Sequence, residues 1–157
     1  MAAATTAISE MERSLPKVID ARKHGIIDYC HAAFFLSMAL LCRKRAPHAA
    51  KAALVTGSFI LVESLLTDYP LGVKKVIPFK VHGQIDAAFA ASSFLVPKIF
   101  GFSRSKSASV FKGNGFVEAA VVGATDFNSA RARREEGPVP AREGRRREES
   151  RPEDCTA

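Results

Sequence analysis

Four side chains that can bind protons or metal ions recur at one spacing. His24 precedes Asp28 by four positions, His82 precedes Asp86 by four positions, and a glycine follows each histidine. Residues spaced i, i+4 share one face of a helix. Imidazole and carboxylate ligands suit several divalent metals, and hydrogen bonds between such groups also join helices inside a membrane. The motif is therefore typical of a metal or proton site and, equally, of a structural contact between helices.

The two motifs belong to a longer internal repeat. Thr67-Asp68-Tyr69 recurs as Thr125-Asp126-Phe127, at the same offset of 58 residues that separates the two His-Gly-x-x-Asp motifs. Self-similarity at a fixed offset indicates a structural unit that is used more than once. We therefore predict two units of the same architecture.

Four apolar segments must position these residues. Alanine, leucine and phenylalanine dominate them and period-two alternation is scarce, which favours helices over strands. Long stretches of the first two segments carry no charged residue on any side, which is typical of helices in lipid. We predict an all-α fold of four transmembrane helices, arranged as two parallel two-helix repeats. A soluble four-helix bundle is the alternative. The segments cover approximately residues 25–42, 52–66, 83–96 and 113–127.

This topology predicts one polar cluster. The start of one helix and the end of the next antiparallel helix lie at the same membrane face, so the repeated motifs should meet at the face that bears both termini. The side chains expected there are those of His24, Asp28, Asp68, His82, Asp86 and Asp126.

Two carboxylates within the apolar segments do not follow the repeat. Under the 58-residue offset Glu63 aligns with Val121, and Glu118 aligns with Ile60. They are therefore not scaffolding shared by both units. Glu63 is a candidate proton-carrying residue, because ionisable groups inside a membrane are functional candidates; an interhelical contact is the alternative. We interpret His31 as a helix-contact histidine.

Composition divides the chain further. The C-terminal tail is rich in arginine and glutamate and poor in apolar residues, so it cannot bury enough surface to fold and is predicted to be disordered. The predicted organisation is a polar N-terminal segment, repeat 1, a connecting loop, repeat 2 and the tail, at residues 1–22, 23–69, 70–80, 81–127 and 128–157.

The net charge of +7 does not indicate nucleic-acid binding. The basic residues form clusters between the apolar segments instead of lining one helix face, which is typical of loops at a lipid surface. The expected partner is the lipid bilayer; a second copy of the chain and a soluble partner for the tail are further possibilities. The distribution of basic residues favours termini in the cytoplasm.

Signatures of enzymes and cofactors are missing from the sequence. It contains no glycine-rich phosphate loop, no G-x-S-x-G motif and no His-Glu-x-x-His motif. Its three cysteines include no C-x-x-C pair. We therefore expect no cofactor, and a membrane-bound enzyme has little support beyond the carboxylates.

A family resemblance rests on three motifs. The His-Gly-x-x-Asp helix start, the Leu-Leu-Thr-Asp-Tyr helix end and the Val-Ile-Pro-Phe-Lys-Val-His link resemble the SPW-repeat family over about residues 22–127. At the place of the family's Ser-Pro-Trp motif this chain keeps Pro97, with Val96 and Lys98 on either side. The resemblance implies a small multi-pass protein of the bacterial inner membrane, built from two-helix repeats. The family has no assigned activity.

Two functions therefore remain open at the level of sequence. The first is a structural or accessory membrane protein whose polar motifs hold the helices together. The second is a small transporter that binds protons or metal ions through the clustered histidines and aspartates.

Overall fold

We analysed a computed structural model of the chain, which describes residues 16–129. Residues 1–15 and 130–157 lie outside the described part, and with them most of the predicted N-terminal segment and of the predicted disordered tail. The described part is mostly helical. Its elements are α2 (Ala21–Cys42), α3 (Pro47–Leu66), β1 (Thr67–Asp68), β2 (Ile77–Pro78), α4 (Phe79–Ser93), α5 (Val96–Ile99) and α6 (Ser107–Ala124).

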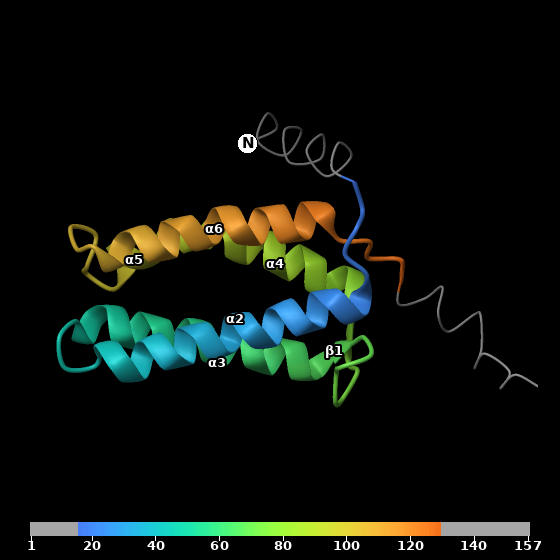
Figure 1. Cartoon of the computed structure of the whole chain (residues 1–157), viewed down its shortest axis with the longest axis horizontal. Coiled ribbons are helices and arrows are strands. Elements are labelled where there is room, and N and C mark those ends of the chain that lie inside the picture. Colours follow the sequence, from blue (N-terminus) through green and yellow to red (C-terminus); the bar gives the residue numbers. More distant parts are fainter. Residues whose placement is uncertain (1–15, 130–157) are drawn as a thin grey trace, which may run out of the picture.

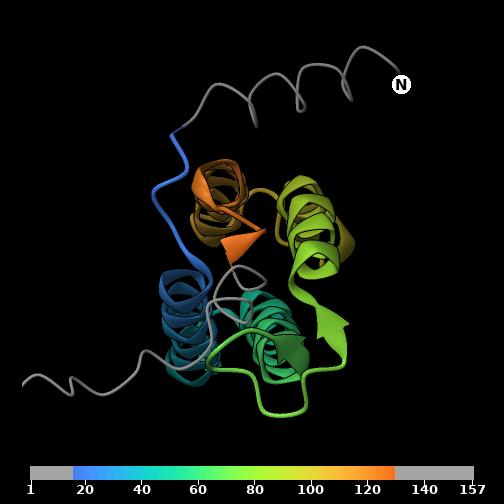
Figure 2. The same ribbon diagram turned by 90° about the vertical axis from the view of Figure 1, so that its right-hand side faces the viewer.

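The four long helices form two hairpins that lie side by side, with all four helices running along the long axis of the bundle. Helices α2 and α3 make the first hairpin, and α4 and α6, joined through the short α5, make the second (Figure 1). Seen end-on, the four helices surround a common centre, with α2 next to α6 and α4 next to α3 (Figure 2). The described chain enters and leaves the bundle at the same end, which is also the end that carries β1.

Local sequence explains where the helices begin and end. The carboxylate of Asp20 caps α2 by accepting hydrogen bonds from two backbone N–H groups of its first turn, each at 2.9 Å. Helix α3 begins at Pro47, whose missing N–H costs nothing in a first turn. Helices α3 and α6 both end at a threonine with extended backbone, Thr67 and Thr125.

In two places the residue that ends a hairpin forms a short parallel β pairing with the extended residues that lead into the first helix of the other hairpin. Thr67 pairs with Ile77 between β1 and β2, and Thr125 pairs with Ile19 in an isolated parallel bridge. The prediction of an all-α fold did not include them. They form because each threonine leaves its helix with extended backbone, beside the extended residues that lead into another helix.

Most helix boundaries differ from the prediction: all four long helices begin before the predicted residue, and only α2 and α3 end where predicted. Helix α4 ends at Ser93, and Pro97 lies in the first turn of α5. Helix α6 begins at Ser107 and continues through Gly113. A glycine inside a helix costs roughly 1 kcal/mol, and the burial of Phe111 in the preceding turn outweighs that cost.

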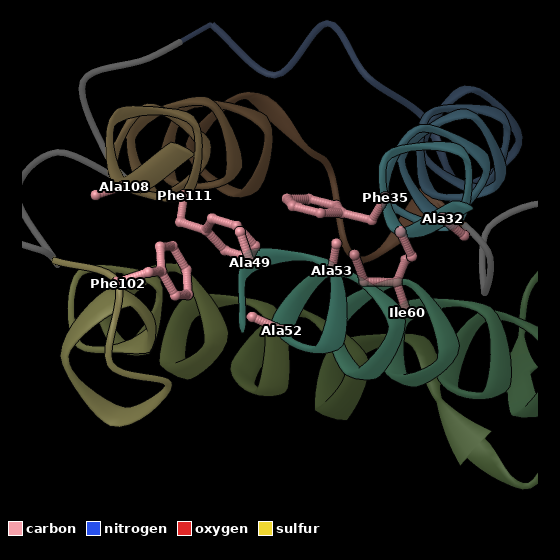
Figure 3. Packing of buried hydrophobic residues seen from close by; sticks show 10 residues of the cluster. Ala32, Phe35, Ala49, Ala52, Ala53, Ile60, Phe102, Ala108 and Phe111 are labelled. Carbon is pink, nitrogen blue, oxygen red and sulfur yellow. The ribbon is translucent and has the colours of Figure 1, made fainter. Parts of the chain in front are cut away.

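Small and aromatic residues fill the centre between the hairpins. The rings of Phe35, Phe102 and Phe111 meet there, with centroids of neighbouring rings 5.2 Å apart. Figure 3 shows these rings beside Ala49 and Ala53 of α3. Alanines at such contacts let helices approach closely.

The outer surface is apolar as well. Large apolar side chains point away from the centre on both hairpins, including Leu41, Leu54, Val55 and Phe116. Among the described residues, α2 and α3 are long and apolar enough to cross a membrane. Helix α4, with 15 residues, is only about 22 Å long.

Candidate metal centre

Two histidines and two aspartates meet at the end of the bundle where the chain enters. His24 and Asp28 come from α2, and His82 and Asp86 come from the equivalent first turns of α4. All four side chains are buried, and none of the four residues is more than 5 % exposed. The i, i+4 spacing places each aspartate on the same helix face as its histidine, and the packing of the hairpins turns the two faces toward each other.

Two imidazole nitrogens and the oxygens of two carboxylates converge between the two helices. The Nε2 atoms of His24 and His82 are 3.1 Å apart. Asp86 Oδ2 lies 3.1 Å from His24 Nε2 and 3.0 Å from His82 Nε2. The Asp28 carboxylate places Oδ1 3.4 Å from His24 Nε2 and Oδ2 3.3 Å from His82 Nε2. Each Nε2 atom thus faces the other imidazole and both carboxylates.

Two threonines determine which nitrogen of each ring carries a proton. The Thr125 hydroxyl donates to the backbone carbonyl of Val121 at 2.7 Å, and its oxygen lies 2.9 Å from His24 Nδ1. Because that hydroxyl has already donated its single proton, it must accept from Nδ1–H. Thr67 repeats the arrangement, donating to the Glu63 carbonyl at 2.8 Å and accepting from His82 Nδ1 at 2.9 Å. In the neutral form of either imidazole, the Nε2 lone pair therefore points into the cluster.

The spacing of the converging atoms suits a metal ion. Zinc bonds of about 2.0–2.1 Å place tetrahedral ligand atoms roughly 3.3 Å apart. The separations that involve an imidazole Nε2 atom run from 3.0 to 3.4 Å, and one ligand atom each from His24, His82 and Asp86 lie within 4.8 Å of one another. Two imidazole nitrogens and two carboxylates are a ligand set for zinc and for similar divalent transition metals. The Nδ1–H···Oγ1 contacts supply the outer hydrogen bonds that orient a metal-binding histidine.

Aromatic rings close the cluster from the end of the bundle. The His24 ring lies edge-on to Phe79 and Phe127, at centroid distances of 5.4 and 5.6 Å. Tyr69 stacks on Phe79 and donates its hydroxyl to Asp28 Oδ2 at 3.3 Å. Burial raises the pKa of Tyr69 above its ordinary value, so the hydroxyl keeps its proton and remains a donor.

The glycine after each histidine makes room for one of these rings. A Cβ on Gly25 would lie 2.1 Å from Tyr69 Cε2, and a Cβ on Gly83 would lie 2.4 Å from Phe127 Cε1. Any side chain at either position would push the ring away from the cluster. Each of these glycines thus permits the close approach of an aromatic side chain.

Glu63 lies behind His82, outside the ligand set. Its Oε1 atom is 3.4 Å from His82 Nδ1, on the side of the ring opposite to Nε2. Among the described residues this oxygen has no hydrogen-bond partner, although the residue is only 5 % exposed. The position equivalent to Glu63 in the second hairpin is Val121, so the outer environment of the two histidines is not identical.

The structure brings together part of the predicted cluster. His24, Asp28, His82 and Asp86 meet as described, whereas Asp68 lies in β1 and Asp126 follows α6. The carboxylate of Asp126 accepts from the backbone N–H of Asn128 at 2.9 Å.

The residues of the Thr-Asp-aromatic motifs that contact the imidazoles are instead the threonines, Thr67 and Thr125. Neither threonine is among the predicted site residues. The motif repeat signalled them, since each is the first residue of a repeated triplet.

Comparison of the chain with protein-family models, with curated proteins and with solved structures found no match. The interpretation of the cluster therefore rests on its own geometry.

Proposed function

We propose that this protein is a four-span membrane protein, built as two parallel two-helix repeats, that binds one divalent transition-metal ion between the repeats. His24, Asp28, His82 and Asp86 are the ligands. The observation that carries the proposal is the 3.1 Å separation of two Nε2 atoms whose rings both have Nδ1–H committed to a threonine. Two Nε2 atoms held at that distance, with two carboxylates beside them, favour a shared positive charge, and a divalent ion balances both carboxylates where a single proton balances one.

A purely structural role explains this geometry less well. Two imidazolium–aspartate pairs would also join α2 and α4. If both rings were imidazolium, two Nε2–H groups would face each other at 3.1 Å and repel. If one proton were shared between the rings, the two carboxylates would have only one positive charge between them. A metal ion removes the conflict because it accepts both lone pairs and both carboxylates at once.

The distribution of side chains supports insertion in a membrane. The acidic residues of the long helices are buried inside the bundle, and large apolar groups such as Leu41, Val55 and Phe116 cover much of the outside. Lipid requires that arrangement, because it solvates apolar surface and not charge. Helix α4 reaches spanning length only together with the turn and α5 that follow it, at residues 79–99.

Repeat architecture is supported by contacts that recur at the 58-residue offset. The offset relates the two threonine–histidine pairs, Thr125–His24 and Thr67–His82, and likewise the β contacts of Ile19 and Ile77. We propose, in line with the SPW-repeat resemblance, that the protein belongs to the bacterial inner membrane with both termini in the cytoplasm. The metal centre then lies near the cytoplasmic face.

Metal binding to the purified full chain tests the proposal. The protein, in detergent micelles, is titrated by calorimetry with Zn²⁺ and, in parallel, with Mn²⁺, and the bound metal is counted by mass spectrometry. One ion per chain is expected, with binding lost in His82→Gln and in Asp86→Asn. His48→Gln is the matched control, because His48 is an exposed histidine that contacts the backbone oxygen of Phe100.

Two outcomes decide between the candidate functions. Saturable binding that disappears in the two site variants but persists in the His48→Gln control supports a metal centre. A folded protein that binds neither metal would overturn it, and the cluster would then be a structural contact between the repeats.

A further inference from the structure

A second polar group lies deeper in the bundle, between α2 and α6. His31 Nδ1 is 3.0 Å from Glu118 Oε2, and His31 Nε2 contacts Asn114 Oδ1. Glu118 and Asn114 are buried, and the side chain of His31 is 14 % exposed. None of these residues belongs to the metal centre, and the nearest ligand on the same helix, Asp28, is three positions before His31.

A chain of hydrogen bonds fixes one ring proton of His31. Ser93 donates its hydroxyl proton to the Phe89 carbonyl at 3.0 Å, so its oxygen is the acceptor for Asn114 Nδ2 at 3.5 Å. The Asn114 amide is thereby oriented with Oδ1 toward His31, and a carbonyl oxygen can only accept. His31 Nε2 must therefore carry a proton. The variable proton is the one at the contact between Nδ1 and the Glu118 carboxylate.

The opposite side of the bundle shows that this polar pair is not required for packing. At the 58-residue offset, Phe89 stands in the place of His31 and Ile60 stands in the place of Glu118. Phe89 and Ile60 take part in the apolar core, where Phe89 also stacks on Phe59 at a centroid distance of 5.5 Å. One interface is thus built with apolar groups where the other holds two ionisable ones.

The surroundings separate the pair from the far end of the bundle. His31 packs on Phe35, with centroids 5.4 Å apart, and Phe35 continues into the aromatic layer with Phe111 and Phe102 (Figure 3). On the other side lie the charged groups that act on the pair, Asp28 of α2 and Glu63 of α3.

On helix α4, Ser93 accepts a hydrogen bond from Asn114 Nδ2. The same helix carries Asp86, whose charge acts on Glu63. Charged groups thus lie between the pair and the proposed metal centre, and apolar rings lie on the opposite side.

We propose that His31 and Glu118 form a proton-exchange site, distinct from the metal centre, with Asn114 and Ser93 as the residues that orient it. In the neutral pair one proton is held between Nδ1 and Oε2. Release transfers that proton to a water molecule and leaves neutral His31 beside the Glu118 carboxylate. Uptake from hydronium protonates the carboxylate while the imidazolium is retained. The site therefore changes the charge of the bundle interior by one unit at each step.

Nuclear magnetic resonance of the ring nitrogens tests the proposal on the full chain in detergent micelles. The protein is labelled with ¹⁵N-histidine, kept free of metal with a chelator, and titrated over the pH range in which it stays folded. The double variant His31→Phe/Glu118→Ile copies the apolar interface and assigns the His31 signals by their loss. We expect the wild-type signals to move between the imidazolium and neutral positions.

A second variant tests whether the proton is shared. In Glu118→Gln the midpoint of the His31 titration should fall by about one pH unit or more, because the imidazolium loses a negatively charged partner. A His31 signal that stays at one value across the range would overturn the proposal, as would a midpoint unchanged in Glu118→Gln. Since the titration is carried out without metal, a failure of the metal-centre proposal does not affect it.

Discussion

The Nε2 atoms of His24 and His82 lie 3.1 Å apart, although 58 residues separate them in the chain. Each ring is held by a threonine from the other hairpin, since His24 contacts Thr125 and His82 contacts Thr67, both at 2.9 Å. Neither hairpin alone can therefore complete the surroundings of its own histidine. The proposed metal centre and the packing of the two hairpins therefore depend on each other.

Removal of either threonine hydroxyl should weaken metal binding. Thr67→Val and Thr125→Val preserve side-chain shape but remove the acceptor of a buried Nδ1–H, which costs about 1–3 kcal/mol of stability in Thr125→Val. The cost should be smaller in Thr67→Val, because Glu63 Oε1 lies 3.4 Å from His82 Nδ1 and can accept instead. Loss of an outer partner of a metal-binding histidine typically lowers affinity about 10- to 100-fold. Zinc calorimetry on both variants measures the change. Unchanged affinity in both would contradict the assignment of the ring protons.

Alanine at Gly25 should destabilise the protein. The new Cβ would lie 2.1 Å from Tyr69 Cε2, so the ring would have to move, and overpacking of this kind costs about 1–3 kcal/mol. Gly113→Ala is the control, because a Cβ at that position would meet nothing within 4 Å beyond its chain neighbours and the nearby backbone of its own helix; it should stabilise α6 by about 0.5–1 kcal/mol. Thermal unfolding in detergent compares the two, and equal midpoints would show that Tyr69 does not pack as described.

Loss of the Tyr69 hydroxyl should affect the metal centre while the ring packing is kept. Tyr69→Phe removes the hydrogen bond to Asp28 Oδ2, so this carboxylate loses an orienting contact, and affinity should fall about 10-fold. Tyr29→Phe is the matched control, since the Tyr29 hydroxyl donates to the Leu71 backbone carbonyl instead. Metal titration of both variants distinguishes the two hydroxyls; an equal loss of affinity would argue against a specific role of Tyr69.

A charge on the outer face of α3 should impair membrane insertion. Val55 is 57 % exposed near the middle of the helix, and a lysine at such a position costs about 2.5–3.5 kcal/mol in insertion. We expect less Val55→Lys protein in carbonate-washed membranes. Lys51→Ala, on the same helix, should leave the yield unchanged. If Val55→Lys increased the yield of soluble protein, the outer face would contact water and the four-span proposal would fail.

Part of the candidate site could be predicted from the sequence because it depends on local geometry. The i, i+4 spacing places His24 and Asp28 on one helix face, and the 58-residue offset predicts an equivalent pair in the second half of the chain. The choice between Thr67 and Asp68 could not be predicted in this way. Thr67 caps α3 with extended backbone, and that local conformation decides which side chain of the motif contacts His82.

The pairing of His31 with Glu118 also required the structure. The sequence showed that Glu118 departs from the repeat, but no spacing rule connects residues 87 positions apart on two different helices. Only the packing of α2 beside α6 brings Nδ1 and Oε2 to 3.0 Å.

By itself, the sequence determined the helical character, the offset between the repeated motifs and the faces on which the ionisable groups lie, because these follow from periodicity and composition. The tertiary structure decided which of those faces meet, which nitrogen of each imidazole is directed at its neighbour, and which carboxylate remains outside the cluster. Such contacts depend on the crossing and register of helices that are distant in the chain, and a buried polar group takes whichever partner that packing places within hydrogen-bond distance.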